Sequence, residues 1–233
     1  MGSGPSILAL KGVSYRWSGR GSFALDVPAF SIATSERVLL LGESGSGKST
    51  LLSLICGTIT PHAGSVLLSG TDIASLSAGK RDRFRAEHIG LIFQQFNLLP
   101  YATVLDNILL SLRFAPQRRA RVAHPQQTAQ KLCMDLGLPK DTLTAQAGTL
   151  SVGQQQRVAA ARALIGAPPL IIADEPTSAL DAATQATFLD LLFEQTRNAG
   201  STLLMVSHDA RLAPQFDRVV QMADIARTAQ AAA

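Results

Sequence analysis

Hydrophobic and polar residues are spaced differently at the two ends of the chain and in its middle. Near both ends, short apolar runs are followed by longer amphipathic stretches, which is the order expected of strands and helices around a parallel sheet. The apolar run at residues 170–173 is unbroken, as is typical of a strand covered on both faces. The predicted strands are residues 7–13, 23–32, 37–41, 65–68, 88–93, 170–173, 202–206 and 218–222.

Helical spacing of apolar residues dominates the middle of the chain. Pro116 and Pro125 are predicted to break the chain between helices there. The predicted helices are residues 48–56, 103–114, 126–136, 151–165 and 184–197. The sequence therefore predicts an α/β fold with a parallel sheet and a helical insertion of roughly fifty residues near 95–150.

Composition and charge narrow the class of protein. The chain has 233 residues, of which 46% are hydrophobic and 16% charged, so it can bury a large core as one domain, or as one domain with an inserted subdomain. Lys and Arg number 21 against 17 Asp and Glu, which gives a net charge of +4. This excess fits an anionic ligand or membrane surface, but it is too small to indicate nucleic-acid binding.

The cysteines and the apolar segments bear on location. Cys56 and Cys133 lie far apart without metal-binding spacing, which favours reduced thiols in a cytosolic protein. The first residues show no secretion signal, and no apolar segment is long enough to cross a bilayer. We therefore expect any work at a membrane to be done through a partner.

Residues 42–49 read GESGSGKS and fit the spacing G-x-x-x-x-G-K-[ST] between a predicted strand and a predicted helix. Glycine lets backbone amides approach phosphate oxygens, and the helix N-terminus adds a favourable dipole. Lys48 is expected to neutralise the β- and γ-phosphates, and the Ser49 hydroxyl to bind Mg²⁺. A flexible glycine turn is the alternative, but the flanking elements favour a nucleoside triphosphate. The expected contact residues are Gly42, Ser44, Gly45, Gly47, Lys48, Ser49 and Thr50.

Two acidic residues, Asp174 and Glu175, directly follow the apolar run 170–173. Ligands of parallel sheets bind at the carboxyl ends of the strands. Asp174 is therefore expected to hold Mg²⁺, and Glu175 to polarise the attacking water as a general base. A helix cap or turn carboxylate is the alternative, but adjacent acids at the end of a buried strand favour catalysis.

Residues 150–157 read LSVGQQQR, and with them the chain resembles the ATP-binding cassette (ABC) ATPases, whose hallmark is an LSGGQ stretch. Ser151 and Gln154 also form an S-x-x-Q capping box, and both interpretations can hold together. The resemblance implies that Ser151, Gly153 and Gln154 receive the γ-phosphate bound by a second subunit. Val152 departs from the family's glycine; because a β-branched residue disfavours positive φ, we expect an ordinary backbone there and a valine that points away.

The resemblance covers nearly the whole chain and implies its domain organisation. It predicts a P-loop NTPase (RecA-like) core with an N-terminal antiparallel β subdomain and an inserted α-helical subdomain. Residues 1–94 and 151–233 are expected to form the core with the β subdomain, and residues 95–150 the helical subdomain, within a single domain 1–233.

The resemblance also assigns residues outside these motifs. Trp17 matches the aromatic residue that stacks on adenine, with Tyr15 as the competing candidate and a plain core aromatic as the alternative. Gln94 matches the glutamine that reaches Mg²⁺ and couples the core to the helical insertion, and Gln95 is its rival. An exposed loop glutamine without a role is the other interpretation.

Two further residues follow from the same resemblance. His208 matches the histidine that contacts the γ-phosphate and positions the attacking water, although a lone histidine after a strand is more often structural. Asp181 ends the stretch SALD, which resembles the loop that communicates across the dimer. A helix N-cap is its other interpretation.

The expected function is that of an ATP-hydrolysing motor, a translocase-type ATPase. Two copies would hold two ATP and Mg²⁺ between them and drive an integral-membrane permease from the cytoplasmic face of the membrane. Residues 96–101 are equally compatible with a groove for a permease helix and with the core of the helical insertion. The sequence around these residues is most similar to the lipoprotein-release and macrolide-efflux branch of the family. A polar amino-acid importer, or a soluble ABC ATPase without a transport role, is the alternative, and no direct nucleic-acid partner is expected.

Overall fold

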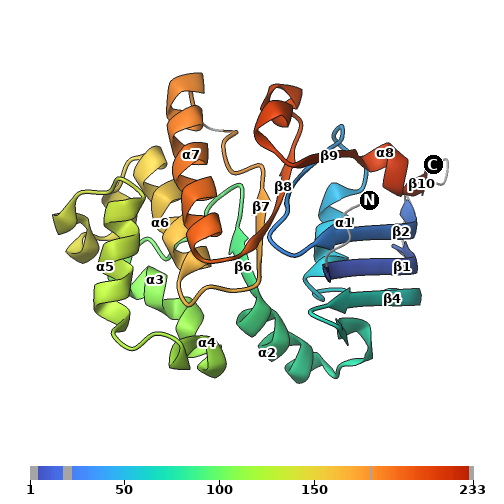
Figure 1. The fold of residues 1–233 in the computed structure, drawn as a ribbon, viewed down its shortest axis with the longest axis horizontal. Helices are drawn as coiled ribbons and strands as arrows, with labels where there is room; N and C mark the ends of the chain where they lie inside the picture. The colour runs from blue at the N-terminus through green and yellow to red at the C-terminus, as the bar shows by residue number, and fades with distance from the viewer. Residues whose placement is uncertain (1–4, 18–22, 179, 231–233) are drawn as a thin grey trace. The chain divides into compact units, whose positions relative to one another are not determined.

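The computed structural model describes residues 5–17, 23–178 and 180–230. The chain folds into two compact units, of which the first contains residues up to 85 and those from 206 onward, and the second residues 86–205. Figure 1 shows the elements of both units, coloured from the N-terminus to the C-terminus.

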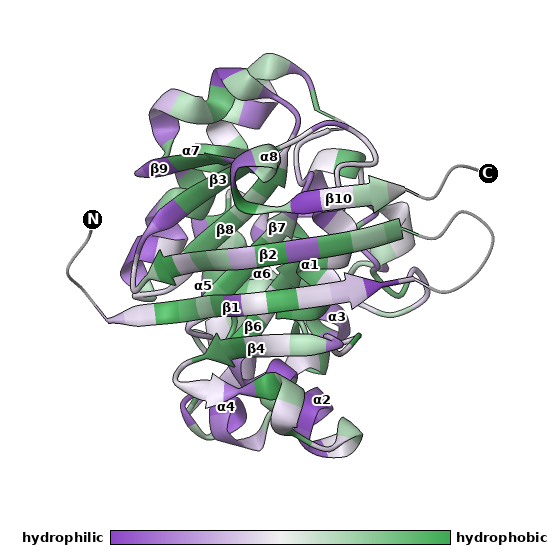
Figure 2. Ribbon diagram, turned by 90° about the vertical axis from the view of Figure 1, so that its right-hand side faces the viewer, coloured by the Kyte–Doolittle hydropathy of each residue, from purple (hydrophilic) through white to green (hydrophobic). Residues whose placement is uncertain are grey.

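An antiparallel sheet forms much of the first unit, with the strand order β10-β2-β1-β4-β5. Inward residues such as Leu8, Leu10 and Val13 alternate with polar ones along its strands, as expected of a sheet with one face on the core (Figure 2). The expected antiparallel β part of the fold is thus present. Its strands are β1 (Ser6–Arg16), β2 (Phe23–Ala33), β4 (Ala63–Leu68), β5 (Thr71–Asp72) and β10 (Arg227–Gln230).

A second strand pair in the first unit leads to the glycine loop. The buried strand β3 (Arg37–Leu41) pairs in parallel with β9 (Arg218–Gln221), and α1 (Lys48–Ile55) follows the loop. Hydrophobic residues fill β3 from its second position to its end, so the strand is fixed in the core. The loop therefore begins from a rigid element.

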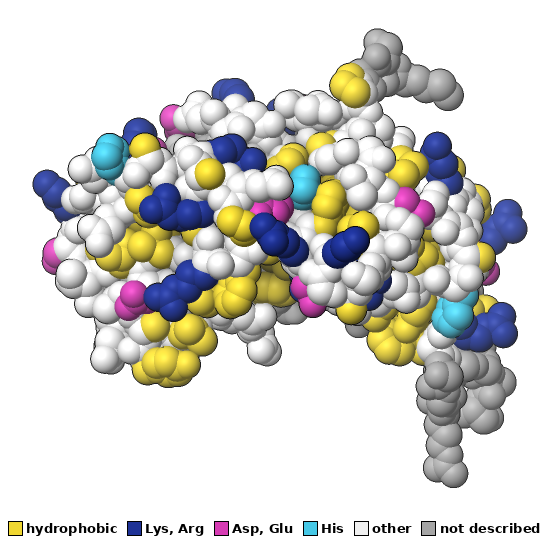
Figure 3. Space-filling model, turned by 90° about the horizontal axis from the view of Figure 1, so that it is seen from below, with side chains coloured by type: hydrophobic (Ala, Val, Ile, Leu, Met, Phe, Trp, Pro, Cys, Tyr) yellow, Lys and Arg dark blue, Asp and Glu magenta, His cyan; other side chains and the backbone are white. Residues whose placement is uncertain are grey.

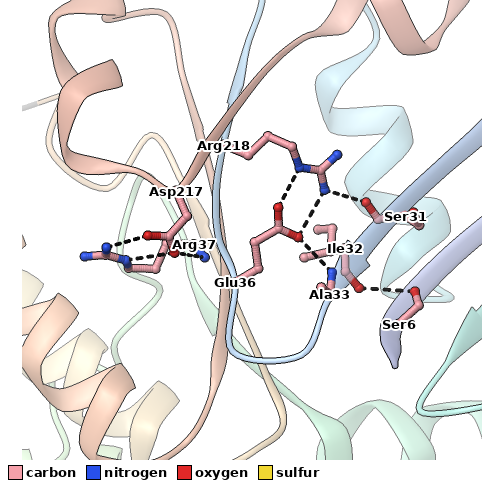
Figure 4. Close-up of polar contacts among 8 residues, drawn as sticks. All are labelled: Ser6, Ser31, Ile32, Ala33, Glu36, Arg37, Asp217 and Arg218. Atoms are coloured by element: carbon pink, nitrogen blue, oxygen red, sulfur yellow. Dashed lines mark hydrogen bonds and ion pairs between the residues drawn. The ribbon is translucent and has the colours of Figure 1, made fainter. Parts of the chain in front are cut away.

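Two ion pairs fasten the start of β3 to distant parts of the first unit (Figure 4). Arg218 Nε donates to Glu36 Oε1 at 2.6 Å, and Arg218 Nη2 donates to the Ser31 carbonyl at 2.6 Å. Arg37 Nη2 lies 2.6 Å from Asp217 Oδ1, and the hydrogen bond to Asp217 raises the pKa of Arg37. These contacts hold the C-terminal segment against β2 and β3.

The second unit combines parallel strands with helices. β6 (Ile89–Ile92) pairs in parallel with β7 (Leu170–Asp174), and β8 (Thr202–Ser207), of which residues 202–205 belong to this unit, follows β7 in the strand order. Gly90 allows a close approach, because a Cβ there would collide with the Ala163 carbonyl of α6. The helices are α3 (Val104–Arg113), α4 (Pro116–Ala120), α5 (Pro125–Asp135), α6 (Val152–Leu164) and α7 (Ala182–Asn198).

A fully buried arginine lies among these elements. Arg118 of α4 donates to the carbonyls of Ala163 and Ile165 at the end of α6, both at 2.7 Å, and to the Ile89 carbonyl at 3.3 Å. The Glu87 carboxylate accepts a bond from the Arg118 backbone amide. Burial lowers the pKa of Arg118 to about 10. The bonded carbonyls offset the cost of burying the guanidinium.

Several elements differ from the sequence-based expectations. Helix α2 (Ala78–His88) was not predicted, because it is mostly polar and only Glu87 in it is buried. Strand β10 was missed because the alanine-rich end of the chain carries no apolar alternation. Met222 was expected to end a strand, but it begins the short helix α8 (Met222–Ile225). Four short 3₁₀ helices complete the described elements: Ile73–Ser75, Lys140–Thr144, Ala147–Thr149 and Ala210–Gln215.

Candidate nucleotide site

The glycine loop has a backbone that suits an anion. Gly45 and Gly47 have φ values of 80° and 97°, a left-handed region that side chains disfavour. A Cβ at Gly47 would also approach the side chains of Phe23 and Leu25 to 3.0 Å. Gly47 is the N-cap of α1 and supplies no side-chain cap, and the first turn of α1 contains no acidic residue. The amides there are therefore placed to bind a negatively charged group.

The side chains of Lys48 and Ser46 add to this anion site. Lys48 Nζ donates to the carbonyls of Gly42 at 2.5 Å and Glu43 at 2.8 Å, so the ammonium group is fixed across the loop. Ser46 Oγ is buried and has no hydrogen-bond partner among the described residues. A fixed cation and uncapped helix amides are features that suit the binding of a triphosphate, and the Ser46 hydroxyl is a further donor in the same loop.

Trp17 is connected to the helix that follows the glycine loop. Trp17 is 44% exposed, and its Nε1 donates to Thr50 Oγ1 of α1 at 3.2 Å. The Tyr15 ring packs edge-on against the Trp17 ring at a centroid distance of 5.2 Å. It also lies beside the His62 ring, at a centroid distance of 5.1 Å. Trp17 thus offers an exposed aromatic surface beside α1, whereas Tyr15 is half-buried. His208 lies in the same unit, exposed, directly after β8.

In the second unit, the acid pair lies where β7 ends. Asp174 is the last residue of β7, and Glu175 follows with a φ of 45°. Such a conformation costs a residue other than glycine about 1–3 kcal/mol, and it persists only where surrounding structure holds it. Gln156 of α6 supplies part of that support, since its buried Nε2 donates to the Pro176 carbonyl at 2.6 Å. The amide oxygen of Gln156 is buried without a partner among the described residues.

The start of α6 confirms the expected capping box. Ser151 Oγ accepts a bond from the Gln154 amide at 3.3 Å, and Gln154 Oε1 accepts one from the Ser151 amide at 2.9 Å. Val152 is the first helical residue, lies outside the left-handed region and is 49% exposed, so the expected ordinary backbone is confirmed. Gly153 lies in the same first turn.

The loop after β6 carries Gln94 and Gln95, both exposed. Phe96 and Asn97 follow with φ values of 57° and 50°, and the Arg162 guanidinium of α6 binds both of their carbonyls. Burial lowers the pKa of Arg162. In the segment 96–101, the buried Phe96 fits the core of the helical insertion, whereas Tyr101, which is 75% exposed, fits a groove for a partner helix.

Asp181 is the N-cap of α7. Its carboxylate accepts bonds from the amides of Ala183 and Thr184, at 3.1 and 3.0 Å. The hydrogen bonds to Thr184 lower the pKa of Asp181, which keeps the cap ionised. Ala179, in the same 178–181 stretch, lies outside the described residues, as do the first four residues of the chain.

Comparisons with known proteins now decide the family. The ABC transporter family matches residues 25–178 of the chain, a span that includes the glycine loop, the start of α6 and the acid pair. The chain belongs to the ABC transporter family. Two of its relatives have names that specify a transport system.

The lipoprotein-releasing system ATP-binding protein LolD of Syntrophotalea carbinolica is 42% identical over 193 residues, which cover 83% of this chain and 83% of LolD. The macrolide export ATP-binding/permease protein MacB of Rhodopirellula baltica is 43% identical over 194 residues. This match covers 83% of the chain but only 28% of MacB, so the chain spans less than a third of that relative.

Solved ABC cassettes share the fold. A dimeric structure of the bacterial ABC transporter cassette MJ0796 superimposes with a TM-score of 0.82 at 32% identity, covering 97% of this chain and all of that one. A second dimeric MJ0796 structure, in a post-hydrolysis state with ADP and Pi, gives a TM-score of 0.79 at 33% identity, covering 92% and 94%. These matches confirm the expected P-loop NTPase fold and identify the chain as an ABC transporter ATPase.

Surface charge and apolar segments complete the description of this ABC ATPase. On the face shown in Figure 3, Lys and Arg side chains lie singly or in pairs between acidic and hydrophobic ones. Within the described ranges, no helix has the length and apolar character that crossing a membrane requires.

Sequence reasoning missed three polar residues that support the site. The buried Ser46 hydroxyl in the glycine loop, and the contacts of Gln156 and Arg162 on α6, were specified by no motif. For Arg162 a signal did exist, because it interrupts the alanine-rich, buried part of α6, whereas Gln156 lies in the polar run before that part. A buried polar side chain in a helix requires a partner, and the nearest loops supply one.

Proposed function

We propose that the chain is the ATP-hydrolysing subunit of an ABC exporter that acts as a homodimer on an integral-membrane permease, in the manner of lipoprotein-release or macrolide-export systems. The observation that carries the proposal is the anion site of the glycine loop, with Lys48 fixed across it, in a chain similar to LolD and to part of MacB. The dimeric structures of MJ0796 support the homodimer.

In this proposal, the residues of the glycine loop bind the triphosphate. Gly42, Ser44, Gly45 and Gly47 form its backbone cradle, and Lys48 provides the positive charge. Trp17 stacks on adenine, an assignment supported by its exposed ring and its bond to Thr50 of α1. Ser151, Gly153 and Gln154, at the start of α6, receive the γ-phosphate bound by the second copy. Asp181 lies in the loop that communicates across the dimer.

The hydrolytic roles fall to residues that follow strands. Glu175 polarises the attacking water as general base, and its backbone position is held partly by the bond from Gln156 to Pro176. His208 contacts the γ-phosphate and helps to orient the water. Ser49, Gln94 and Asp174 have the hydroxyl, amide and carboxylate oxygens that Mg²⁺ prefers. When bound, Mg²⁺ would neutralise charge that develops on the phosphates.

The output of the cycle is movement of a partner. Two copies close around ATP and open after hydrolysis, and the permease converts this motion into transport. The chain would thus be peripheral on the inner face of the cell membrane, attached through the permease. Residues 95–150 would form the helical subdomain, which is inserted in the sequence between the two parts of the core, 1–94 and 151–233. The second candidate, an importer ATPase, has no observation in its favour here beyond membership of the family.

The proposal is tested with Glu175→Gln, which keeps the shape of the side chain and removes the base. We expect ATP affinity close to that of the wild type, a fall in turnover of about 10²–10⁴-fold, and an ATP-dependent dimer in light scattering. Glu194→Gln is the matched control, because Glu194 is an exposed glutamate on α7. A Glu175→Gln protein that stays monomeric with ATP, with or without the permease, would contradict the two-copy mechanism.

A further inference from the structure

Helix α6 connects two candidate regions of the second unit. Its first turn holds Ser151–Gln154, and near its other end lies Arg162. Arg162 Nη1 donates to the Asn97 carbonyl at 2.6 Å, and Nη2 donates to the Phe96 carbonyl at 2.5 Å. These carbonyls belong to the second and third residues after Gln94. One guanidinium therefore binds two consecutive carbonyls of the loop that follows Gln94.

The backbone that Arg162 binds is strained. Phe96 and Asn97 are consecutive residues other than glycine with φ values of 57° and 50°. L-residues disfavour this left-handed region, and a large aromatic residue does so more than asparagine. A strained conformation persists only where surrounding contacts hold it. Both carbonyls bound by Arg162 belong to the strained residues, so the arginine acts directly on the conformation in question.

The remaining contacts join the loop to a larger assembly. Asn107 of α3 is fully buried; its Oδ1 accepts the Leu99 amide at 2.8 Å, and its Nδ2 donates to the Leu99 carbonyl at 3.1 Å. Ser111 of α3 donates to the Arg162 carbonyl at 3.1 Å. Helix α6 packs against α3 and β6 (Figure 1). Bonds from α3 and α6 thus fix both the middle and the far end of the loop.

We propose that Arg162 is a positioning residue for ATP hydrolysis, because it keeps the loop that carries Gln94 in a fixed relation to the helix that carries Ser151–Gln154. The planar guanidinium is suited to this work, since its N–H groups form a rigid fork, and two of its nitrogens reach two neighbouring carbonyls at once. The inference rests on the roles proposed above for Gln94 and Ser151. It places the effect of Arg162 on the chemical step, while ATP binding by residues 42–50 is independent of it.

The test compares Arg162→Met with Arg157→Met. Arg157 lies on the same helix and donates through Nη1 to the Gly137 carbonyl at 3.1 Å, so its removal also costs α6 an arginine–carbonyl bond. For Arg162→Met we expect kcat to fall at least about tenfold with KM for ATP within about threefold of the wild type. Arg157→Met is expected to stay within about twofold in both constants. Arg162→Lys, which keeps the charge but lacks the rigid fork of the guanidinium, is expected to lie between Arg162→Met and the wild type.

Hydrogen exchange supplies a readout that a general loss of stability would not give. In Arg162→Met the amides of residues 94–99 are expected to exchange faster, while those of β7 keep the exchange rates of the wild type. A kcat no lower than that of Arg157→Met, or a loss confined to KM, would overturn the inference. If Arg162→Met fails to fold, Arg162→Lys decides, and a kcat within about twofold of the wild type overturns it.

Failure of the proposed function is distinguishable from failure of this inference. A wild-type protein without ATP turnover, or a Glu175→Gln protein that retains turnover, contradicts the proposed function. A wild type that hydrolyses ATP, together with an Arg162→Met protein that matches Arg157→Met, contradicts only the role of Arg162.

Discussion

The glycine loop of the first unit and helix α6 of the second unit are held by contacts of very different range. Lys48 binds carbonyls that lie five and six residues away in the sequence. The side chains of α6 reach much farther, because Gln156 binds a carbonyl 20 residues away and Arg162 binds carbonyls 65 and 66 residues away. The first region is therefore a local device, and the second depends on the tertiary fold.

This difference determines what a change in each region does. Removal of the Lys48 side chain alters a ligand contact and leaves the core intact, because this side chain binds only carbonyls of the glycine loop itself among the described residues. Replacement of an arginine that makes long-range bonds in the second unit releases segments that are distant in sequence. Its first effect is therefore on the stability of the fold or on the geometry of the bound segments. Stability and affinity measurements on matched variants should separate the two kinds of effect.

The largest effect is expected from Arg118→Met in the second unit. The change leaves the buried carbonyls of Ala163 and Ile165 without their donor, so the free energy of unfolding should fall by about 3–5 kcal/mol. Urea unfolding measures this loss. Arg121→Met is the control, because the exposed side chain of Arg121 donates to the Gly166 carbonyl. A loss below about 1 kcal/mol for Arg118→Met would contradict the role of long-range bonds.

Lys48→Ala tests the local region. Removal of the ammonium group should weaken ATP binding about 100-fold, equivalent to roughly 2.7 kcal/mol, because charge-assisted bonds to phosphate are lost. The free energy of unfolding without ATP should change far less than for Arg118→Met. Calorimetric titration with ATP measures the affinity, and Lys80→Ala, at an exposed lysine of α2, is the control. Unchanged affinity would count against the nucleotide assignment of the loop.

Ser151→Ala places a local change in the second region. Loss of the capping hydroxyl should lower the free energy of unfolding by about 1 kcal/mol, which thermal or urea unfolding detects. Ser151→Thr keeps a hydroxyl and should retain most of the stability. Equal losses in the two variants would show that the capping box contributes little, and that α6 is held by its long-range bonds alone.

The smallest effect concerns Cys133, which is buried on α5 of the second unit. Burial raises the pKa of its thiol to about 11 from a model-compound value of 9.0, so the folded protein should resist iodoacetamide at pH 8. The unfolded thiol ionises first as pH rises, so this stabilising contribution is present below pH 9.0 and lost towards pH 11.

Mass spectrometry of the labelled protein measures whether Cys133 stays buried in the second unit. The same labelling applied to Arg118→Met should reveal faster modification of Cys133 than in the wild type. Rapid labelling of the wild-type protein at pH 8 would contradict the buried position of this thiol.

Elements with apolar periodicity were predictable from the sequence, and elements without it were not. Helix α3 was expected at 103–114 and forms at Val104–Arg113, because its apolar spacing and the Thr103 cap agree. Helix α2 was not predicted, because most of its residues are polar or charged and nearly all of them lie outside the core. The order of motifs gave the family and the fold class, while the roles of the individual site residues remain predictions.

By itself, the sequence determined the chemistry that this protein offers: a glycine loop with Lys48, an acid pair after a buried strand, and a capped helix start at Ser151. These are patterns of close neighbours, and backbone geometry over a few residues gives them their meaning. Only the tertiary structure decided that Arg118 is buried among carbonyls and that Arg162 holds the loop after Gln94. The physical reason is that a long side chain chooses its partner by proximity in the folded chain, which spacing along the sequence does not encode.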